Sequence, residues 1–331
     1  MMTEVVYAQA VDPAVEQAHA HVLALFREDP ASYPAGLDGV CRAARDRLGA
    51  MPVLDPRDPG AWASYELITT DVQTLLAYLR LTGVPSGEPE SFRSLLIRVL
   101  RYLHEADEGK LGVLLAEAVH RDWAARWGES HPHTLEAAER LAACLHAQGD
   151  SEQARPLFER VLGSRAEKLG ADDPATLLAA CHLGACLNQL AEFQAALRLN
   201  NDTVWRCERR LGKYDGTAIL AMGNLAGSLF GLGEHRMALT MYRDIAQRLR
   251  RVSGDNSLVT LAAEANVAVT LHQLGDHEAA RGVNADLLPR FEEAAGKDYS
   301  GTKLTRRRLE KNLRALGRVE ADEVRGGIPQ F

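Results

Sequence analysis

The stretch AMGNLAGSLFGLGEH, residues 221–235, places four glycines inside a pattern that otherwise predicts a helix. Glycine in a helix interior costs roughly 0.8–1 kcal/mol relative to alanine, so Gly223, Gly227, Gly231 and Gly233 need a reason. A phosphate-binding loop, a helix-dimer face and a helix that leaves room for a ligand would each explain them.

The last of these glycines belongs to a series in which successive members are 42 residues apart. Turn positions recur at Gly149, Ala191, Gly233, Gly275 and Gly317. A second series, with the same spacing, runs Gly128, Gly170, Gly212, Gly254 and Gly296, and an alanine series runs Ala154, Ala196, Ala238 and Ala280. A register kept over this many positions identifies the chain as a repeat array.

Each repeat predicts two helices joined by a short turn. Thr134, Thr176, Thr260 and Thr302 recur where the first helix begins, and threonine is a capping residue type. Two apolar rows, four residues apart, then give that helix a buried face. The rows are Leu141, Leu183, Leu225, Val267 and Leu309, followed by Leu145, Leu187, Leu229, Leu271 and Leu313. An all-α fold is therefore expected.

The string LGDHEAA (274–280) and the small residues Ala142, Gly184, Ala226 and Ala268 resemble tetratricopeptide (TPR) repeats. The period and the LGxxxPxTL linker are similar to the kinesin light chain subtype. NNDTVWRCERRLG and GNLAGSLFGLGEH resemble bacterial arrays that follow STAND/NB-ARC-type signalling NTPases, some associated with modified-peptide gene clusters. The resemblance implies a right-handed superhelical solenoid over residues 91–317, with about five units and a capping helix at 302–317.

Residues 1–90 do not follow the period and predict an N-terminal helical region. Three helical patterns, DPAVEQAHAHVLALFRE, LDGVCRAARDRLGA and AWASYELITTDVQTLLAYLRLTG, are separated by proline-rich joints. The sequence contains no GxxxxGK[ST] motif, so the NTPase module of the similar proteins is not expected here. Residues 318–331 are expected to form a flexible tail.

Composition restricts the function classes. The 331 residues carry a net charge of −7 and are 6% aromatic, with no apolar run of membrane-spanning length and no pattern of a signal peptide. We therefore expect a cytoplasmic protein that does not bind membranes, and nucleic acid is an unfavoured partner. Five cysteines without a CxxC motif argue against a zinc ribbon or a disulfide framework.

No set of residues predicts catalysis, a metal site or a cofactor. HExxH is absent, and His131 and His133 have no third ligand at a useful spacing. Cys144 and Cys186 occupy the same repeat position, which favours a packing row over redox chemistry. Cys181 falls at a groove position and is the one cysteine that we would test for reactivity.

TPR arrays generally bind peptides on the concave surface lined by the first helix of each repeat, and the resemblance places groove positions at fixed offsets from the turn residue. These positions are Arg98, Arg101, His104, Arg140, His146, His182, Asn188, Gln189, Gly223, Asn224, Gly227, Phe230, Asn266, Val269, His272, Gln273, Arg307, Arg308, Lys311 and Arg314. Among them Asn224 and Asn266 are expected to hold a peptide backbone, because one amide can donate to a C=O and accept from an N–H.

The residues 303–318, KLTRRRLEKNLRALGR, carry about six net positive charges, counted from the sequence. This segment suggests an acidic peptide or a free carboxylate as partner, while a solvated end-cap face remains the alternative. The leading hypothesis is a non-enzymatic peptide- or protein-binding scaffold or adaptor, accessory to a bacterial signalling or modified-peptide system. A peptide-sensing regulator that changes shape, a groove-based enzyme and a self-associating protein remain alternatives, and the oligomeric state is open.

Overall fold

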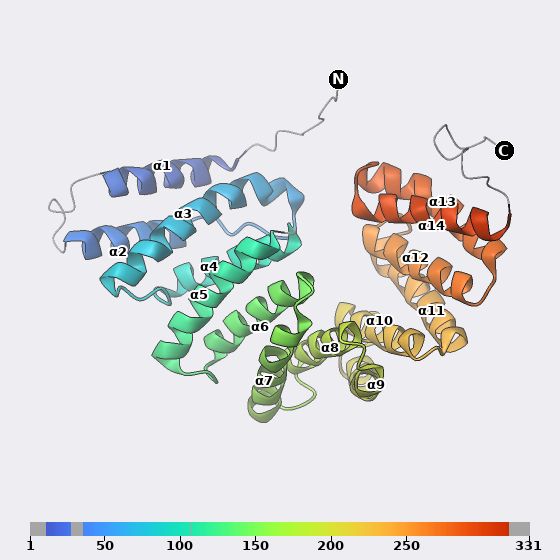
Figure 1. Ribbon diagram of the computed structural model, residues 1–331. Helices are drawn as coiled ribbons and strands as arrows, with labels where there is room; N and C mark the ends of the chain where they lie inside the picture. Colours follow the sequence, from blue (N-terminus) through green and yellow to red (C-terminus); the bar gives the residue numbers. More distant parts are fainter. Residues whose placement is uncertain (1–10, 28–35, 107, 318–331) are drawn as a thin grey trace, which may run out of the picture. The chain divides into compact units, whose positions relative to one another are not determined.

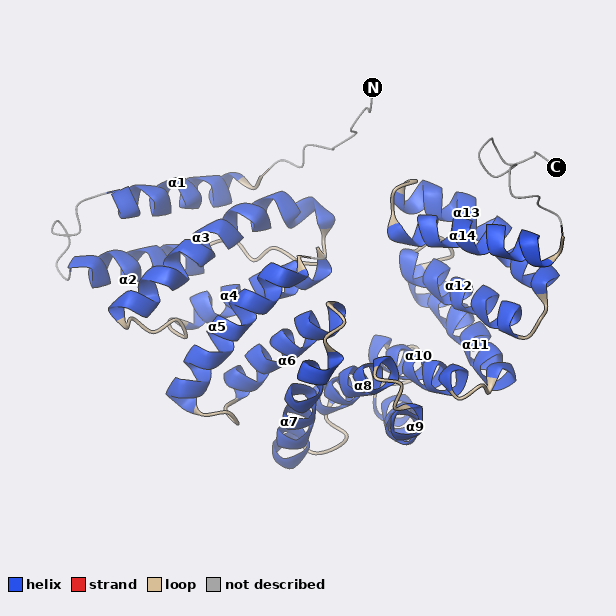
Figure 2. Ribbon diagram, viewed as in Figure 1, coloured by secondary structure: helices blue, strands red, loops and turns tan. Residues whose placement is uncertain are grey.

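The computed structural model describes residues 11–27, 36–106 and 108–317, and this part of the chain contains fourteen α-helices and no strand (Figures 1 and 2). The predicted all-α fold is confirmed. The chain divides into two compact units, residues 1–164 and 165–331, and the boundary falls within α7 (Ser151–Leu169). The predicted tail, 318–331, lies outside the described residues.

Unit 1 contains the N-terminal helices and the first repeats. The three helices predicted before residue 90 are confirmed as α1, α2 and α3, and α2 and α3 both pack against α4. The predicted domain boundary at residue 90 stays a prediction, because these helices belong to the same compact unit as α4. The helices are α1 (Pro13–Arg27), α2 (Gly36–Gly49), α3 (Trp62–Thr82), α4 (Glu90–Glu105), α5 (Gly109–Trp127) and α6 (Pro132–Ala147), with a short 3₁₀ helix, η2 (Pro59–Ala61).

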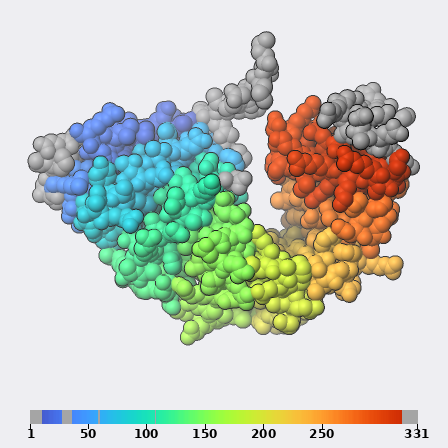
Figure 3. Space-filling model, in the orientation of Figure 1, coloured from blue at the N-terminus to red at the C-terminus, as the bar shows by residue number. Residues whose placement is uncertain are grey.

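Unit 2 alternates the first and second helices of successive repeats. First helices are α8, α10, α12 and α14, and each packs against the neighbouring second helices α9, α11 and α13 of the unit. In the space-filling view, side chains close the gaps between successive helices within the unit (Figure 3). The bounds are α8 (Pro174–Gln189), α9 (Phe193–Arg210), α10 (Gly216–Gly231), α11 (His235–Ser253), α12 (Leu258–Gln273), α13 (His277–Ala295) and α14 (Ser300–Ala315).

The predicted apolar rows form the core between these helices. Leu141, Leu183, Leu225, Val267 and Leu309 are all buried, and so are Leu145, Leu187, Leu229 and Leu271. The four alanines of the alanine series are each 0% exposed, which lets the second helix of each repeat approach its first helix closely.

The start of each first helix corrects one prediction. The capping side chains of α8, α10 and α12 are Asp173, Asp215 and Ser257, each of which accepts a hydrogen bond from a backbone N–H of the first turn. The repeated threonines lie three residues later and are buried. Thr260 Oγ1, for example, donates to the Gly254 carbonyl at 2.8 Å. The threonine spacing marked the helix start correctly but not the residue that caps it.

The turn glycines have the left-handed backbone that their series implied. Gly149, Gly233 and Gly275 have φ values of 87°, 84° and 82°, and Ala191 reaches the same region at 59°. A side chain is strained there, whereas glycine is not.

We expect Ala191→Gly to stabilise the protein by about 0.5–1 kcal/mol, because relief of the left-handed strain outweighs the extra unfolded-state entropy of glycine. Urea unfolding followed by far-UV circular dichroism measures this change. Gly233→Ala is the matched reverse substitution and should destabilise. A lower midpoint for Ala191→Gly would contradict the strain argument.

Candidate functional site

The predicted groove residues lie on the first helices, but they divide between the two units. Unit 1 holds five of them, on α4 and α6, and unit 2 holds fifteen, on α8, α10, α12 and α14. Each set is therefore described by itself.

Polar side chains join α8 to α10. Asn224 Nδ2 donates to the Cys181 carbonyl at 2.7 Å, and Asn188 Nδ2 donates to the Asn224 carbonyl at 2.8 Å. Ser228 Oγ donates to Asn188 Oδ1 at 2.8 Å and accepts from Asn200 Nδ2 of α9 at 3.0 Å. Asn188 and Asn224 thus fix the spacing of two helices, and the side-chain oxygen of Asn224 has no hydrogen-bond partner among the described residues.

The glycines Gly223, Gly227 and Gly231 of α10 differ in their surroundings. A Cβ at Gly223 would meet no atom within 4 Å. A Cβ at Gly227 would lie 3.3 Å from Asn188 Nδ2, and one at Gly231 would lie 2.3 Å from the Phe193 ring. Gly231 is therefore explained by the packing of Phe193, and the expectation that it leaves room for a ligand is wrong. Gly223 keeps that room.

The groove positions of α12 are more open than those of α10. Asn266 and Gln273 are exposed, and Val269 is partly buried between them. His272 Nδ1 lies 3.1 Å from His277 Nδ1, and burial together with the nearby Lys311 and His277 lowers the pKa of His272. Phe230, at the position of α10 equivalent to His272, packs against the unit 2 core and the His235 ring.

Four cations of α14 lack a carboxylate partner. Arg307, Arg308, Lys311 and Arg314 have no carboxylate within 4.0 Å among the described residues, whereas Lys303 pairs with Asp298 at 3.1 Å. Arg308 is half-buried, and this burial lowers the pKa of its guanidinium. The partly dehydrated, unneutralised charge favours an anion at this helix.

In unit 1 the predicted positions have more internal partners. Arg101 lies 3.7 Å from Glu105, and Arg140 lies 3.5 Å from the buried Glu139. His146 Nδ1 is 2.8 Å from Ser151 Oγ. Together with Arg98 and His104 these residues form polar positions on α4 and α6.

In unit 2, His182 is partly buried on α8 and Gln189 is exposed at its end.

Cys181 does not have the environment of a reactive thiol. It is 1% exposed, and a hydrogen bond to Cys207 and burial raise the pKa of its thiol. Burial also raises the pKa of Cys144, to about 11. All five cysteines are free and buried, so the groove position expected for Cys181 is wrong.

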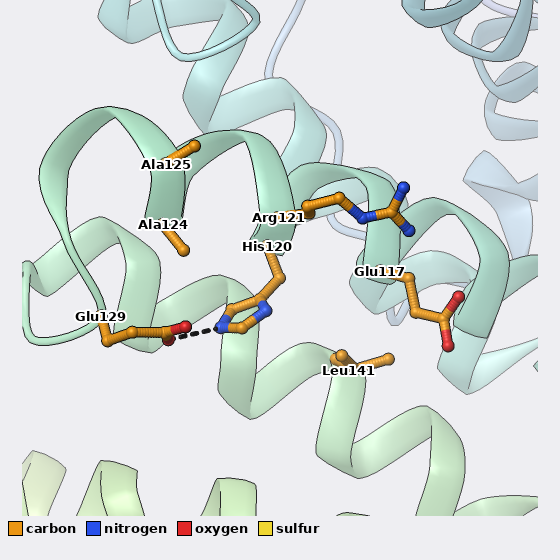
Figure 4. Close-up of a pocket in the computed structure, with 7 residues that line it drawn as sticks. All are labelled: Glu117, His120, Arg121, Ala124, Ala125, Glu129 and Leu141. Atoms are coloured by element: carbon orange, nitrogen blue, oxygen red, sulfur yellow. Dashed lines mark hydrogen bonds and ion pairs between the residues drawn. The ribbon is translucent and has the colours of Figure 1, made fainter.

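The sequence reasoning did not predict an open depression of about 500 Å³ in unit 1 (Figure 4). His120 of α5 lies 3.2 Å from Glu129, which also pairs with Arg160. The lining residues are Glu117, His120, Arg121, Ala124, Ala125, Glu129 and Leu141. The two groups that approach each other, His120 and Glu129, neutralise one another when the imidazole is protonated.

Within the described residues, no group of three or more histidine, cysteine, aspartate or glutamate side chains is arranged to hold a metal ion. No helix in the same part of the chain is long and apolar enough to cross a membrane.

Comparisons with known proteins identify the repeats. Residues 123–204 and 217–293 match the tetratricopeptide repeat family. Among curated proteins, none matches the sequence.

Solved structures resemble the fold, and two of them illustrate the similarity. Nearly identical TPR-like repeats of a Podospora anserina protein described as a kinesin light chain align with a TM-score of 0.51 and 18% identity, over 60% of this chain and 94% of that one. BtubC (BKLC) from P. vanneervenii aligns with a TM-score of 0.53 and 17% identity, over 62% of this chain and 83% of that one. The chain therefore carries tetratricopeptide repeats in an all-α fold.

Proposed function

We propose that the protein is a non-enzymatic scaffold that binds an extended, acidic segment of a peptide or protein partner along the first helices of unit 2. The observation that carries this proposal is the set of unneutralised cations on α14, namely Arg307, Arg308, Lys311 and Arg314. An acidic side chain or a free carboxylate would supply the missing counter-charge, and arginine binds carboxylates through two parallel hydrogen bonds.

Asn266 is the residue best suited to hold the ligand's backbone. Its side chain is exposed on α12, which is the first helix of the repeat before α14, and no described residue forms a hydrogen bond with its amide. It can donate to a peptide C=O and accept from a peptide N–H at the same time. Asn224 has a different role in the proposal, because its amide nitrogen already holds the Cys181 carbonyl.

Val269 on α12 would supply an apolar contact to the ligand. The open space beside Gly223 on α10 would accommodate one of the ligand's side chains. Since neighbouring helices pack 8–10 Å apart and an extended chain spans about 3.3 Å per residue, a ligand crossing four first helices has about twelve residues.

The resemblance to repeat arrays of bacterial signalling NTPases extends the proposal to the protein's setting. The scaffold would act in the bacterial cytoplasm, as an accessory of a signalling or peptide-modification system. This part rests on the resemblance alone and does not affect the proposed binding chemistry.

Fluorescence anisotropy with a labelled peptide of about twelve alternating glutamate and serine residues tests the proposal. We expect the double substitution Arg307→Glu and Arg314→Glu to weaken binding at least about tenfold, since each reversed charge repels the ligand. Asn266→Ala should weaken binding about fivefold, because it removes one donor and one acceptor.

Lys303→Glu is the matched control for the single substitution Arg307→Glu. Both reverse one charge on α14, but Lys303 is paired with Asp298. The proposal requires a larger loss for Arg307→Glu than for Lys303→Glu. Equal losses would mean that the peptide senses only the net charge of the protein, and the assignment to α14 would be wrong.

A further inference from the structure

A second basic feature of unit 2 lies away from the predicted groove positions, where the loop between α9 and α10 meets the end of α11. It is a hollow of about 240 Å³ lined by Lys213, Tyr214, Asp244, Gln247, Arg248 and Arg251. None of these residues was predicted as a site from the sequence.

Tyr214 holds two cations at the hollow. Lys213 Nζ lies 5.2 Å and Arg251 Cζ lies 5.1 Å from the centre of its ring. Arg251 also donates to the Tyr214 hydroxyl at 2.5 Å. Cation–π contacts and this hydrogen bond orient the Arg251 guanidinium without neutralising it.

The remaining charges of the hollow are already paired. Arg248 contacts Asp244 at 2.8 Å and Glu208 at 2.6 Å, and it donates to the Lys213 carbonyl at 2.9 Å. Neither Lys213 nor Arg251 has a carboxylate within 4.0 Å among the described residues. Lys213 and Arg251 are therefore the two cations of the hollow without a carboxylate partner among the described residues, whereas Arg248 already faces two carboxylates.

The equivalent corner of the preceding repeat, 42 residues earlier, is neutral. Arg206 corresponds to Arg248 and Arg209 to Arg251, but Asp172 stands where Tyr214 would be. Asp172 pairs with Arg206 at 2.8 Å and with Arg209 at 2.7 Å. Arg209, the equivalent of Arg251, is thus neutralised in the preceding repeat.

The equivalent corner of the following repeat is acidic. Arg290 corresponds to Arg248, but Asp255 replaces Lys213 and Glu293 replaces Arg251. Arg290 pairs with Asp286 and Glu264 and donates to the Asp255 carbonyl. The three corners thus share only the arginine position of Arg206, Arg248 and Arg290, and the two neighbouring corners pack without an unpaired cation.

We propose that the hollow around Tyr214 binds a phosphate monoester. A phosphate monoester carries about −1.5 to −2 charges at pH 7 and three acceptor oxygens, which suit the two cations without a carboxylate partner, Lys213 and Arg251. Arg251 supplies paired N–H donors in a fixed orientation, Lys213 supplies an ammonium, and Tyr214 supplies an aromatic wall. This site lies outside the predicted groove, so the proposal stands independently of the peptide-binding function.

Isothermal titration calorimetry with phenyl phosphate, inorganic phosphate and benzoate tests the site on the full chain. We expect phenyl phosphate to bind more tightly than either other ligand. Tyr214→Asp and Arg251→Glu should each weaken phenyl phosphate binding at least about tenfold, because the first adds a carboxylate beside Arg251 and the second replaces one of the two unpaired cations by an anion. Both introduce residue types that the chain already has at an equivalent corner, and circular dichroism verifies that the variants fold.

Arg209→Glu is the matched control, since it reverses one charge at the preceding corner and should leave the affinity for phenyl phosphate within about twofold. The proposal is overturned if the wild-type chain does not bind phenyl phosphate, or if Arg251→Glu weakens binding no more than Arg209→Glu does. Equal affinity for benzoate would show that the site does not distinguish a phosphate from a carboxylate. Equal affinity for inorganic phosphate would show that the site does not recognise the ester group. Either result contradicts the assignment.

Discussion

Trp123→Ala is expected to lower the free energy of unfolding of unit 1 by about 3–5 kcal/mol, the range for removing a large buried aromatic side chain. Trp123 is 0% exposed on α5. Its ring centre lies 5.8 Å from that of Trp127 and 6.4 Å from that of His133. Alanine would leave a cavity between α5 and α6, because the helix backbones on either side are held by the rest of the repeat.

Cys207→Ala provides the control within the same chain. Cys207 occupies the equivalent position two repeats later and is also 0% exposed, but its side chain is small. Its loss should cost about 1 kcal/mol. Urea unfolding followed by circular dichroism compares the two variants, and equal shifts of the unfolding curve would show that side-chain volume at this position does not stabilise the repeats.

The second large effect is expected at Glu264, a buried carboxylate of α12. Glu264 is 6% exposed and pairs with Arg250 at 2.7 Å and Arg290 at 2.8 Å. Removing one partner of a buried pair costs about 3–5 kcal/mol, and we expect roughly 2–3 kcal/mol for Glu264→Ala because Arg250 is 48% exposed. Thermal and urea unfolding measure this loss.

Glu264→Met separates the charge from the packing. Met222 occupies the equivalent position of the preceding repeat and is 4% exposed, so a methionine fits this place in the array. Glu264→Met should recover part of the loss by filling the space left in Glu264→Ala. If Glu264→Ala is as stable as the wild type, the two arginine contacts do not hold α11, α12 and α13 together.

The repeat architecture could be predicted because it depends on local spacing. The series that contains Gly233 marks turns in which φ must be positive, and the series that contains Leu225 marks a helix face that must be buried. Both requirements are met within a few residues of the chain, so the sequence pattern is enough to locate them.

The sequence could not reveal contacts that come from another helix. From the sequence, the missing side chain at Gly231 suggested open space on the helix face, but the Phe193 ring from the start of α9 occupies that space. Asn224 looked free, but the carbonyl that it binds, that of Cys181, is 43 positions earlier. Sequence offsets from a turn residue indicate a helix face and do not show what the neighbouring helix places against it.

The hollow around Tyr214 could have been found from the sequence by a different comparison. The repeat alignment aligns Tyr214 with Asp172 and Asn256, and Arg251 with Arg209 and Glu293. The change of charge along these columns is visible without a structure. What the sequence could not show is that Tyr214 and Arg251, 37 residues apart, are in hydrogen-bond contact.

Amide hydrogen–deuterium exchange of the full chain, with and without the glutamate–serine peptide, tests the proposed binding surface most directly. We predict slower exchange in α12 and α14, since a ligand held by Asn266 and the α14 cations restrains both helices. The Arg307→Glu and Arg314→Glu variant should lose this protection. Protection confined to α9 and α11, or no protection in unit 2 at a peptide concentration that saturates the anisotropy signal, would contradict the proposed function.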